Sequence, residues 1–379
     1  KNNAKNMKKV LFVATVYKHI YAFHLPYIKW FVDNGYRVDV AAKKNADDIA
    51  YVTNNIDIPI ARHPFKLTNI KAIRQLKNII EKEQYDLVYC HTAMGAVAAR
   101  LASISSRKTG KTKVLYVAHG FHFFKGCPKK FWMLYYPIEK YLSQFTDGIV
   151  TINQEDYEMV KTHNFKNKDT FLIPGIGVPT ERFVVVSDQR KSELRKENGF
   201  NDNDFILIYV AEYIYRKNHK FIIDSIPLLI EKIPNLKILF AGRGILMDET
   251  INYNKSKGLD KYVEFLGFRK DIGQLVALSD IGISASRQEG LGLNIAEEMF
   301  CKIPVVATID RGHKELIING ETGFMFKQGD HNDFANRVIE LYDDNEKRTK
   351  MGNKAFEYVQ KFRLENSLEC VSKIFKHYL

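Results

Sequence analysis

Short apolar runs and amphipathic segments alternate along the chain. Apolar runs that predict buried strands occupy residues 10–14, 37–42, 86–90, 113–118, 148–152 and 170–173. The segments between them are typical of helices, and residues 70–84 place four apolar side chains on one face: Ile70, Ile73, Leu76 and Ile80. Helices are also expected over residues 23–34 and 93–103. This alternation predicts a parallel sheet that is covered by helices on both faces.

The same pattern restarts in the second half of the chain. After a turn-rich segment, 174–179, and a charged segment, 187–204, strands are expected at residues 205–211, 236–241, 263–266, 281–284, 304–307 and 323–326. The sequence therefore predicts an α/β protein of two doubly wound, Rossmann-like domains facing each other across a cleft. The expected domains are residues 1–180 and 181–355. Residues 356–379 are expected to form a helix that packs back on the first domain.

Composition adds an expectation about partners. The 379 residues suit two domains, and 45% of them are hydrophobic. Lys and Arg exceed Asp and Glu by 57 − 44 = 13, so we expect an anionic partner: nucleic acid, an anionic membrane surface or a phosphorylated substrate. The basic residues are scattered pairs rather than one block, so we expect no nucleic-acid partner.

The cysteines and the apolar content bear on location. The four cysteines form no C-x-x-C pair and fit no zinc module, which is typical of a reduced, cytosolic compartment: Cys90, Cys127, Cys301 and Cys370. No apolar run has the length of a membrane span. Residues 1–6 are polar, lack the apolar stretch of a signal peptide and are excluded from the fold prediction.

The strongest chemical signal is the segment EGLGLNIAE at residues 289–297. A buried strand leads into it, the glycines Gly290 and Gly292 loosen the loop, and a helix is expected from residue 294. Backbone N–H groups at such a helix start can meet a phosphate, and Glu297 can reach sugar hydroxyls. The pattern indicates a nucleotide-sugar site, whereas two solvated acids near a helix end are the alternative.

Residues 280–307 resemble the donor-site region of the retaining family 4 glycosyltransferases, which have the two-domain GT-B fold. Further motifs of this resemblance are PVVA at 304–307, GHKEL at 312–316, GETG at 320–323, GIGVP at 175–179 with Arg182 and Phe183, and AEYIYRKNH at 211–219. Four motifs in the first half resemble the capsule and exopolysaccharide branch: AFHLPY at 22–27, HGFHFFKG at 119–126, YYPIEKY at 135–141 and TINQED at 151–156.

The resemblance implies roles for the second half of the chain. Glu297 would hold the ribose hydroxyls, and Glu289 would contact the donor sugar, because a carboxylate accepts two neighbouring O–H bonds. The loop between them would complete the donor site with Gly290, Leu291, Gly292 and Leu293. Lys217 and Arg216 would clamp the diphosphate. Glu212 stands where many family members carry arginine, so Arg216 is expected to supply the missing charge.

Other positions carry weaker signals. His119 follows an expected strand, and the matching family histidine faces the donor sugar. Gly242 and Gly244 are expected to shape the nucleotide-base pocket with residues 267–269, although most Gly-x-Gly pairs are simple turns. Three residues lie in a loop near the donor side, and for them a donor-binding role and a structural role are equally open: Arg311, His313 and Glu315.

Aromatic and basic residues mix over residues 121–145, which suits contact with membrane headgroups. A core helix with lysines on its wet face is the alternative. On this acceptor or membrane side we expect six residues: His24, His122, Lys125, Lys129, Lys130 and Trp132.

We therefore expect a retaining, metal-independent glycosyltransferase without a cofactor. Its donor would be a nucleotide sugar, with a UDP-linked N-acetylated amino sugar favoured. Its acceptor would be a lipid-diphosphate-linked saccharide in capsule or exopolysaccharide synthesis, at the cytoplasmic face of the cell membrane. Asp202 and Asp204 form an Asp-x-Asp that is interpreted as a turn. The alternatives are a nucleotide-sugar epimerase or hydrolase of the same fold and a non-enzymatic polyanion-binding protein.

Overall fold

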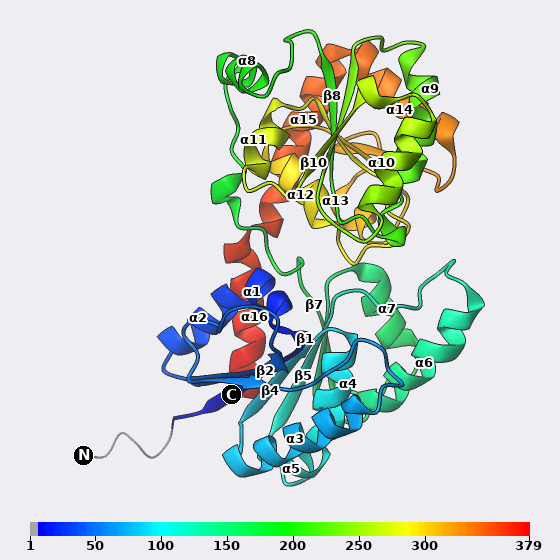
Figure 1. The fold of residues 1–379 in the computed structure, drawn as a ribbon. Coiled ribbons are helices and arrows are strands. Elements are labelled where there is room, and N and C mark those ends of the chain that lie inside the picture. The colour runs from blue at the N-terminus through cyan, green and yellow to red at the C-terminus, as the bar shows by residue number, and fades with distance from the viewer. Residues whose placement is uncertain (1–6) are drawn as a thin grey trace. The chain divides into compact units, whose positions relative to one another are not determined.

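A computed structural model describes residues 7–379, so residues 1–6, excluded above, lie outside the described part. The chain forms two compact units (Figure 1). The first contains the residues up to Ile176 together with Glu365–Leu379, and the second is Gly177–Leu364. Each unit is built on one parallel sheet with helices packed against it.

The first unit contains a sheet of seven parallel strands within the described residues, in the order β3-β2-β1-β4-β5-β6-β7. The strands are β1 (Lys9–Val16), β2 (Arg37–Lys43), β3 (Asn54–Asp57), β4 (Leu87–His91), β5 (Lys113–Ala118), β6 (Gly148–Thr151) and β7 (Asp169–Leu172). Central strands such as β1 are apolar and buried on both faces, as expected for a parallel sheet. The strand β3 was not predicted.

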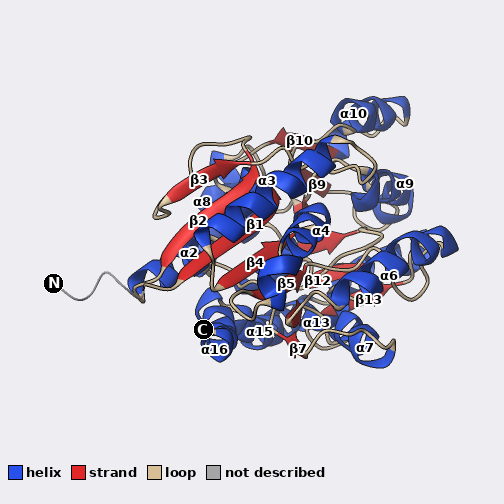
Figure 2. Ribbon diagram, turned by 90° about the horizontal axis from the view of Figure 1, so that it is seen from below, coloured by secondary structure: helices blue, strands red, loops and turns tan. Residues whose placement is uncertain are grey.

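The helices of the first unit are α1 (Tyr17–Phe23), α2 (Leu25–Asp33), α3 (Thr68–Glu83), α4 (Ala93–Ala102), α5 (Ile104–Lys108), α6 (Lys129–Ser143), α7 (Gln154–Thr162) and α16 (Leu364–Tyr378). Helices α3 and α4 pack together, and α4 lies against β1 and β4 (Figure 2). The C-terminal α16 lies beside α1 and α2 (Figure 1), where Phe375 packs on Phe31 with ring centroids 4.3 Å apart.

The second unit contains six parallel strands in the order β10-β9-β8-β11-β12-β13. They are β8 (Phe205–Val210), β9 (Leu236–Ala241), β10 (Val263–Gly267), β11 (Ile281–Ser284), β12 (Val305–Thr308) and β13 (Gly323–Phe326). Its helices are α8 (Asp188–Glu197), α9 (His219–Ile230), α10 (Met247–Ser256), α11 (Ile272–Leu278), α12 (Leu293–Phe300), α13 (His313–Leu316), α14 (His331–Asp343) and α15 (Asn345–Val359), with 3-10 turns at Thr180–Arg182, Tyr215–Lys217, Asp260–Tyr262 and Gln360–Phe362.

The last predicted helix, residues 356–379, is wrong at its start. The chain leaves α15 at Val359, makes a 3-10 turn, and α16 begins only at Leu364. The break has a physical reason, because Val178 N–H donates to Phe362 O (2.9 Å) and Leu364 N–H donates to Val178 O (3.1 Å). These bonds take up backbone groups that a continuous helix would use internally.

The charged segment 187–204 belongs to the second unit. It contains α8, whose first turn is capped by the Ser187 hydroxyl accepting from Arg190 N–H (3.2 Å). Arg195 fixes α8 through an ion pair with Asp280 (Nη2 to Oδ2, 2.7 Å). After it, Asp204 accepts from Asn201 N–H (2.7 Å), so the Asp-x-Asp of this segment forms a turn.

The carboxyl ends of parallel strands gather at one edge of each sheet, and this edge holds the polar loops of both units. In the first unit, His91 ends β4 and His119 follows β5. In the second, the loop at 211–218 follows β8, 242–246 follows β9, and 285–292 follows β11.

Candidate functional site

Three of the predicted site residues meet around the carboxylate of Glu289. The Glu289 side chain is 8% exposed and forms ion pairs with Lys217 and with Arg216 (Nη1 to Oε2, 2.8 Å). Arg216 Nη1 also donates to the Gln288 carbonyl oxygen (2.7 Å). Because β8 and β11 are neighbours in the sheet, the loops that follow them lie close together, and these ion pairs link the two loops.

The charges of this cluster leave a positive excess. Burial raises the pKa of Glu289, but the charges of Lys217 and Arg216 outweigh it and bring the pKa to about 2. Glu289 is therefore ionised at neutral pH, and two cations face one anion. The side chain of Arg216 is 40% exposed, so it can also reach an anion that comes from solvent.

The turn from Gly290 to Leu293 is held by the loop after β12. Asp310 Oδ1 accepts from the N–H groups of Glu289 (3.1 Å) and Gly312 (2.8 Å). Gly292 has a φ of 94°, and a Cβ atom there would lie 2.9 Å from His313 Cδ2. Glycine is required at this start of α12 because both the backbone conformation and the space exclude a side chain.

A cavity of about 470 Å³ lies beside Glu297 within the second unit. Its lining combines one carboxylate, three cations and two aromatic rings with apolar side chains: Arg182, Phe183, Val210, Phe268, Arg269, Lys270, Ile272 and Glu297. Burial raises the pKa of Glu297 to about 7, against the opposing charge of Arg182. This lining offers an acceptor for sugar hydroxyls, cations for phosphate and a ring face for a base.

Close packing of the backbone explains why glycine stands at positions 242 and 244. A Cβ atom on Gly242 would lie 1.9 Å from Ala211 O, and one on Gly244 would lie 2.4 Å from Tyr213 O. Tyr213 N–H donates to Arg243 O (2.9 Å), so the loops after β8 and β9 touch through their backbones. The expected contact of these glycines with a nucleotide base stays a prediction.

The first unit gathers four histidines, which we call the histidine cluster: His19, His24, His91 and His119. His24 Nε2 lies 3.2 Å from His19 Nε2, and His119 Nε2 lies 3.5 Å from His91 Nδ1. The rings of His24 and His91 stack with centroids 3.8 Å apart. Burial lowers the pKa of His19 to about 4 and those of the other three well below their usual range. All four imidazoles are therefore neutral at neutral pH.

Of the six residues expected on the acceptor or membrane side, His24 and Trp132 are not exposed. His24 is 1% exposed because it packs inside the histidine cluster. Trp132 is half-buried, and its Nε1–H donates to Phe124 O (3.1 Å) while its ring packs on Phe123. The other four residues are exposed: His122, Lys125, Lys129 and Lys130.

Helix α6 has an apolar stripe on its exposed surface. Met133, Leu134, Ile138 and Tyr141 are 73%, 38%, 37% and 59% exposed. Their spacing places them on one face of the helix. The opposite face is anchored by Glu139, which is buried and pairs with the fully buried Arg100 of α4 (2.8 Å). Among residues 7–379, no helix combines the length and apolar character needed to cross a membrane.

Sequence reasoning missed several residues that the structure adds to these sites. Asp310 and Arg182 were not among the predicted site residues, although Arg182 stood in a recognised motif. His19 and His91 were also missed. The available signal was position, since His91, like His119, stands where a central strand ends.

Comparison with known proteins relates the chain to sugar-transferring enzymes. The family "Glycosyl transferases group 1" matches residues 190–358, and "Glycosyl transferase 4-like" matches residues 9–153. The chain is 45% identical over 372 residues to the "Putative glycosyltransferase EpsD" of Bacillus subtilis (strain 168), covering 98% of this chain and 97% of that one.

Two further comparisons concern better described proteins. An Escherichia coli "UDP-Gal:alpha-D-GlcNAc-diphosphoundecaprenol alpha-1,3-galactosyltransferase" is 25% identical over 75% of this chain and 73% of its own length. The crystal structure of Anabaena HepE in complex with UDP and glucose superposes with a TM-score of 0.77, covering 98% of this chain and 100% of that one at 20% identity. The fold is thus the GT-B fold.

Proposed function

The chain belongs to the group 1, family 4-like glycosyltransferases, and from this premise we propose that it transfers a sugar, with retention of configuration, from a nucleotide-diphospho-sugar to a saccharide hydroxyl. The observation that carries this proposal is the paired arrangement in the second unit: two cations on Glu289 and a cavity beside Glu297. The first suits a diphosphate, and the second suits a nucleoside.

The proposed reaction uses the leaving group as the base. The acceptor oxygen bonds to the anomeric carbon while the bond from that carbon to the diphosphate oxygen breaks. The acceptor proton passes to the departing phosphate on the same face of the sugar. Lys217 and Arg216 stabilise the negative charge that develops on the diphosphate. Glu289 holds both cations in place and accepts from a hydroxyl of the sugar, and His119 hydrogen-bonds another hydroxyl.

No metal ion is needed in this proposal, because the side-chain cations already face the leaving group. Glu297 accepts the ribose hydroxyls, and Arg269 and Lys270 in the same cavity attract the anionic donor. The favoured donor is a UDP-linked N-acetylated amino sugar. The favoured acceptor is a saccharide on a lipid diphosphate in capsule or exopolysaccharide synthesis, a chemistry that the name of the Escherichia coli relative supports.

A lipid-linked acceptor requires the enzyme to work at a membrane surface, and helix α6 offers the contact. Its exposed stripe of Met133, Leu134, Ile138 and Tyr141 follows the exposed Lys129 and Lys130. Apolar side chains can enter the headgroup boundary while the lysines bind anionic lipids. We infer a peripheral association at the cytoplasmic face.

The donor assignment is tested by replacing Glu297 and Lys217 with alanine and measuring transfer from a panel of UDP- and GDP-sugars to a lipid-linked acceptor. Both variants should lose at least about a hundredfold in kcat/KM, as expected for a lost transition-state or substrate contact. Glu231→Ala and Lys232→Ala are matched controls, because both are exposed and precede β9 at the other end of the strand. Full activity in either site variant would refute the assignment.

The same transfer assay, together with a measurement of thermal stability, distinguishes the alternative functions. A nucleotide-sugar hydrolase or epimerase would consume the donor at an equal rate without acceptor, whereas a transferase requires it. A non-enzymatic polyanion-binding protein would be stabilised against heat by nucleic acid but not by UDP. We expect stabilisation by UDP alone and product formation only with acceptor.

A further inference from the structure

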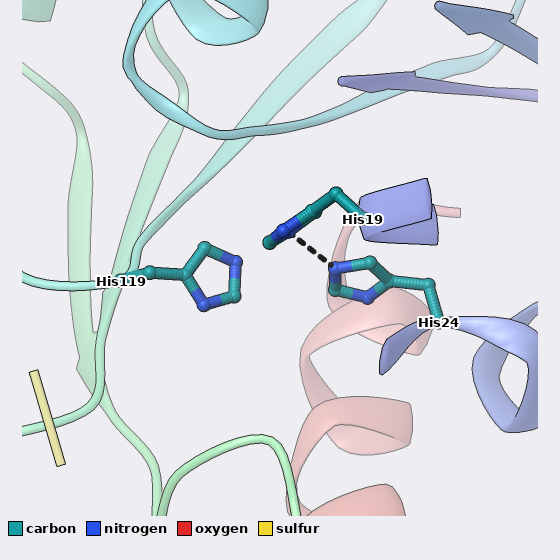
Figure 3. Close-up of side chains that lie close together, drawn as sticks. All are labelled: His19, His24 and His119. Carbon is teal, nitrogen blue, oxygen red and sulfur yellow. Dashed lines mark hydrogen bonds between the residues drawn. The ribbon is translucent and has the colours of Figure 1, made fainter. Parts of the chain in front are cut away.

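Three members of the histidine cluster converge as metal ligands do. His19 comes from α1, His24 stands between α1 and α2, and His119 follows β5. One ring nitrogen from each lies within 4.8 Å of the others. Figure 3 shows the rings of His19 and His24 in contact and the ring of His119 turned toward them. Residues far apart in sequence thus present three nitrogens to one point.

The spacing of these nitrogens is close to that of a zinc site. Nitrogen ligands lie about 2.0–2.1 Å from Zn²⁺ in a tetrahedral arrangement, so two of them are about 3.3 Å apart. The His19 and His24 nitrogens are already 3.2 Å apart. The ligand nitrogen of His119 lies no more than 4.8 Å from the other two, so it has to approach them by at most about 1.5 Å to complete the site.

The hydrogen bonding of the cluster also suits a metal. A ring nitrogen that carries no proton has a lone pair to give to a metal ion. Two facing imidazole nitrogens can hydrogen-bond only if one donates, whereas a metal ion takes a lone pair from both. His24 Nδ1 is buried and has no hydrogen-bond partner among the described residues, so the hydrogen-bond partner of this ring is the facing Nε2 of His19.

His91 packs against two of the ligands. Its ring stacks on that of His24 with centroids 3.8 Å apart, and its Nδ1 lies 3.5 Å from Nε2 of His119. The candidate ligands among residues 7–379 at this point are imidazoles without a carboxylate. Such a donor set favours zinc, copper and nickel over magnesium and calcium, and three ligands leave a fourth position open.

We propose that His19, His24 and His119 bind one late first-row divalent transition metal ion, represented by Zn²⁺, and that this ion inhibits sugar transfer. The inhibition rests on the proposed function, in which His119 hydrogen-bonds the donor sugar. A metal ion occupies the lone pair that this contact uses and places a charged, hydrated group beside it. The binding itself depends only on the geometry of the first unit.

The binding experiment uses the full chain without a histidine tag. Zn²⁺ is titrated against a chromogenic chelator, and Co²⁺ replaces it for visible absorption spectroscopy. We expect one equivalent of Zn²⁺ per chain, a tetrahedral Co²⁺ spectrum and no competition by Mg²⁺. His19→Ala should weaken binding by at least about a hundredfold, because a ligand is lost. His63→Ala is the matched control, since His63 is exposed and outside the cluster, and its affinity should equal that of the parent chain.

Two outcomes overturn the site: no stoichiometric binding, or equal affinity in the parent chain and His19→Ala. His19 is only half-buried, so this variant is expected to fold, and its circular dichroism checks that it does. The inhibition is measured as the ratio of transfer rates with and without one equivalent of Zn²⁺. Binding without inhibition would overturn the link to His119, and a chain without any transfer activity would overturn the proposed function while leaving the binding result intact.

Discussion

Two carboxylates of one loop and helix have opposite electrostatic surroundings. Glu289 faces Lys217 and Arg216, and its pKa falls to about 2 although burial raises it. Glu297 is removed from water with only the charge of Arg182 to oppose the effect, and its pKa rises to about 7. Near neutral pH, Glu289 is a fixed anion while Glu297 exchanges its proton. A pair of acids that titrate so differently is typical of functional sites.

The exchangeable proton of Glu297 predicts the pH dependence of nucleotide binding. Ribose hydroxyls donate to the carboxylate form, so UDP binds that form better and lowers the pKa of Glu297. Binding should therefore release a proton near pH 7, and UDP affinity should fall about tenfold per pH unit below the pKa of about 7. Calorimetry in two buffers of different ionisation enthalpy measures the proton release.

Glu297→Gln is the control for this proton, because the amide does not titrate but keeps an acceptor oxygen. Between pH 5 and 8 its UDP affinity should follow only the ionisation of the terminal phosphate of UDP, whose second pKa is about 6. A parent chain with the same pH profile as Glu297→Gln in this range would contradict the role of Glu297 as the ribose acceptor.

Single residues of the site were predictable where a motif carried them. Glu289, Arg216 and Lys217 were singled out by type and position, and the structure joins them because β8 and β11 are neighbouring strands. The partners Asp310 and His91 could not be found in this way. Their importance comes from a hydrogen bond and a ring contact that depend on the fold rather than on neighbours in sequence.

At the scale of elements, the contact between the loops after β8 and β9 predicts a stability effect. In Gly242→Ala, the new Cβ atom would lie 1.9 Å from Ala211 O, so one of the two loops has to move. We expect a loss of about 2–4 kcal/mol in the free energy of unfolding, measured by urea denaturation. Gly199→Ala is the control, because φ is 79° there and the space is open. It should lose only about 1 kcal/mol. Equal losses would contradict the steric explanation.

Helix α6 predicts lipid binding. Replacing Met133 and Leu134 together by glutamate places two charges in its exposed apolar stripe, and association with vesicles of phosphatidylglycerol and phosphatidylcholine should fall at least about tenfold. Sedimentation with the vesicles measures the bound fraction. Replacing Lys71 and Lys77 of α3 by glutamate changes the net charge more without touching α6. If that variant lost as much binding, general charge rather than α6 would account for the association.

Elements were predictable where their pattern was apolar. The strand β3 escaped prediction because its sequence, Asn54 to Asp57, is polar and pairs with only one neighbour at the edge of the sheet. The break between α15 and α16 escaped because residues 355–375 keep a helical apolar spacing throughout. The backbone bonds of Val178 with Phe362 and Leu364 account for the interruption of the helix.

At the scale of the whole molecule, the order of the segments along the chain differs from their grouping into the two hydrophobic cores. The last segment, α16, completes the core of the first unit, where Phe375 is fully buried against Phe31 and Tyr89. The second unit has a separate core in which Phe334 is fully buried against Phe221 and Phe326. The proposed nucleotide site lies in the second unit alone.

Two cores and one nucleotide site predict two distinguishable unfolding transitions. Saturating UDP, at about a hundred times its Kd, should stabilise only the second unit, by about 2.7 kcal/mol. Phe375→Ala should cost about 3–5 kcal/mol and lower the transition that UDP leaves unchanged, because it opens a cavity in the first core. Phe334→Ala, equally buried, should lower the transition that UDP raises. Differential scanning calorimetry with and without UDP measures both. A single transition that both variants lower equally would mean that the two units unfold together. Helix α16 would then stabilise the nucleotide site of the second unit as much as the core of the first unit.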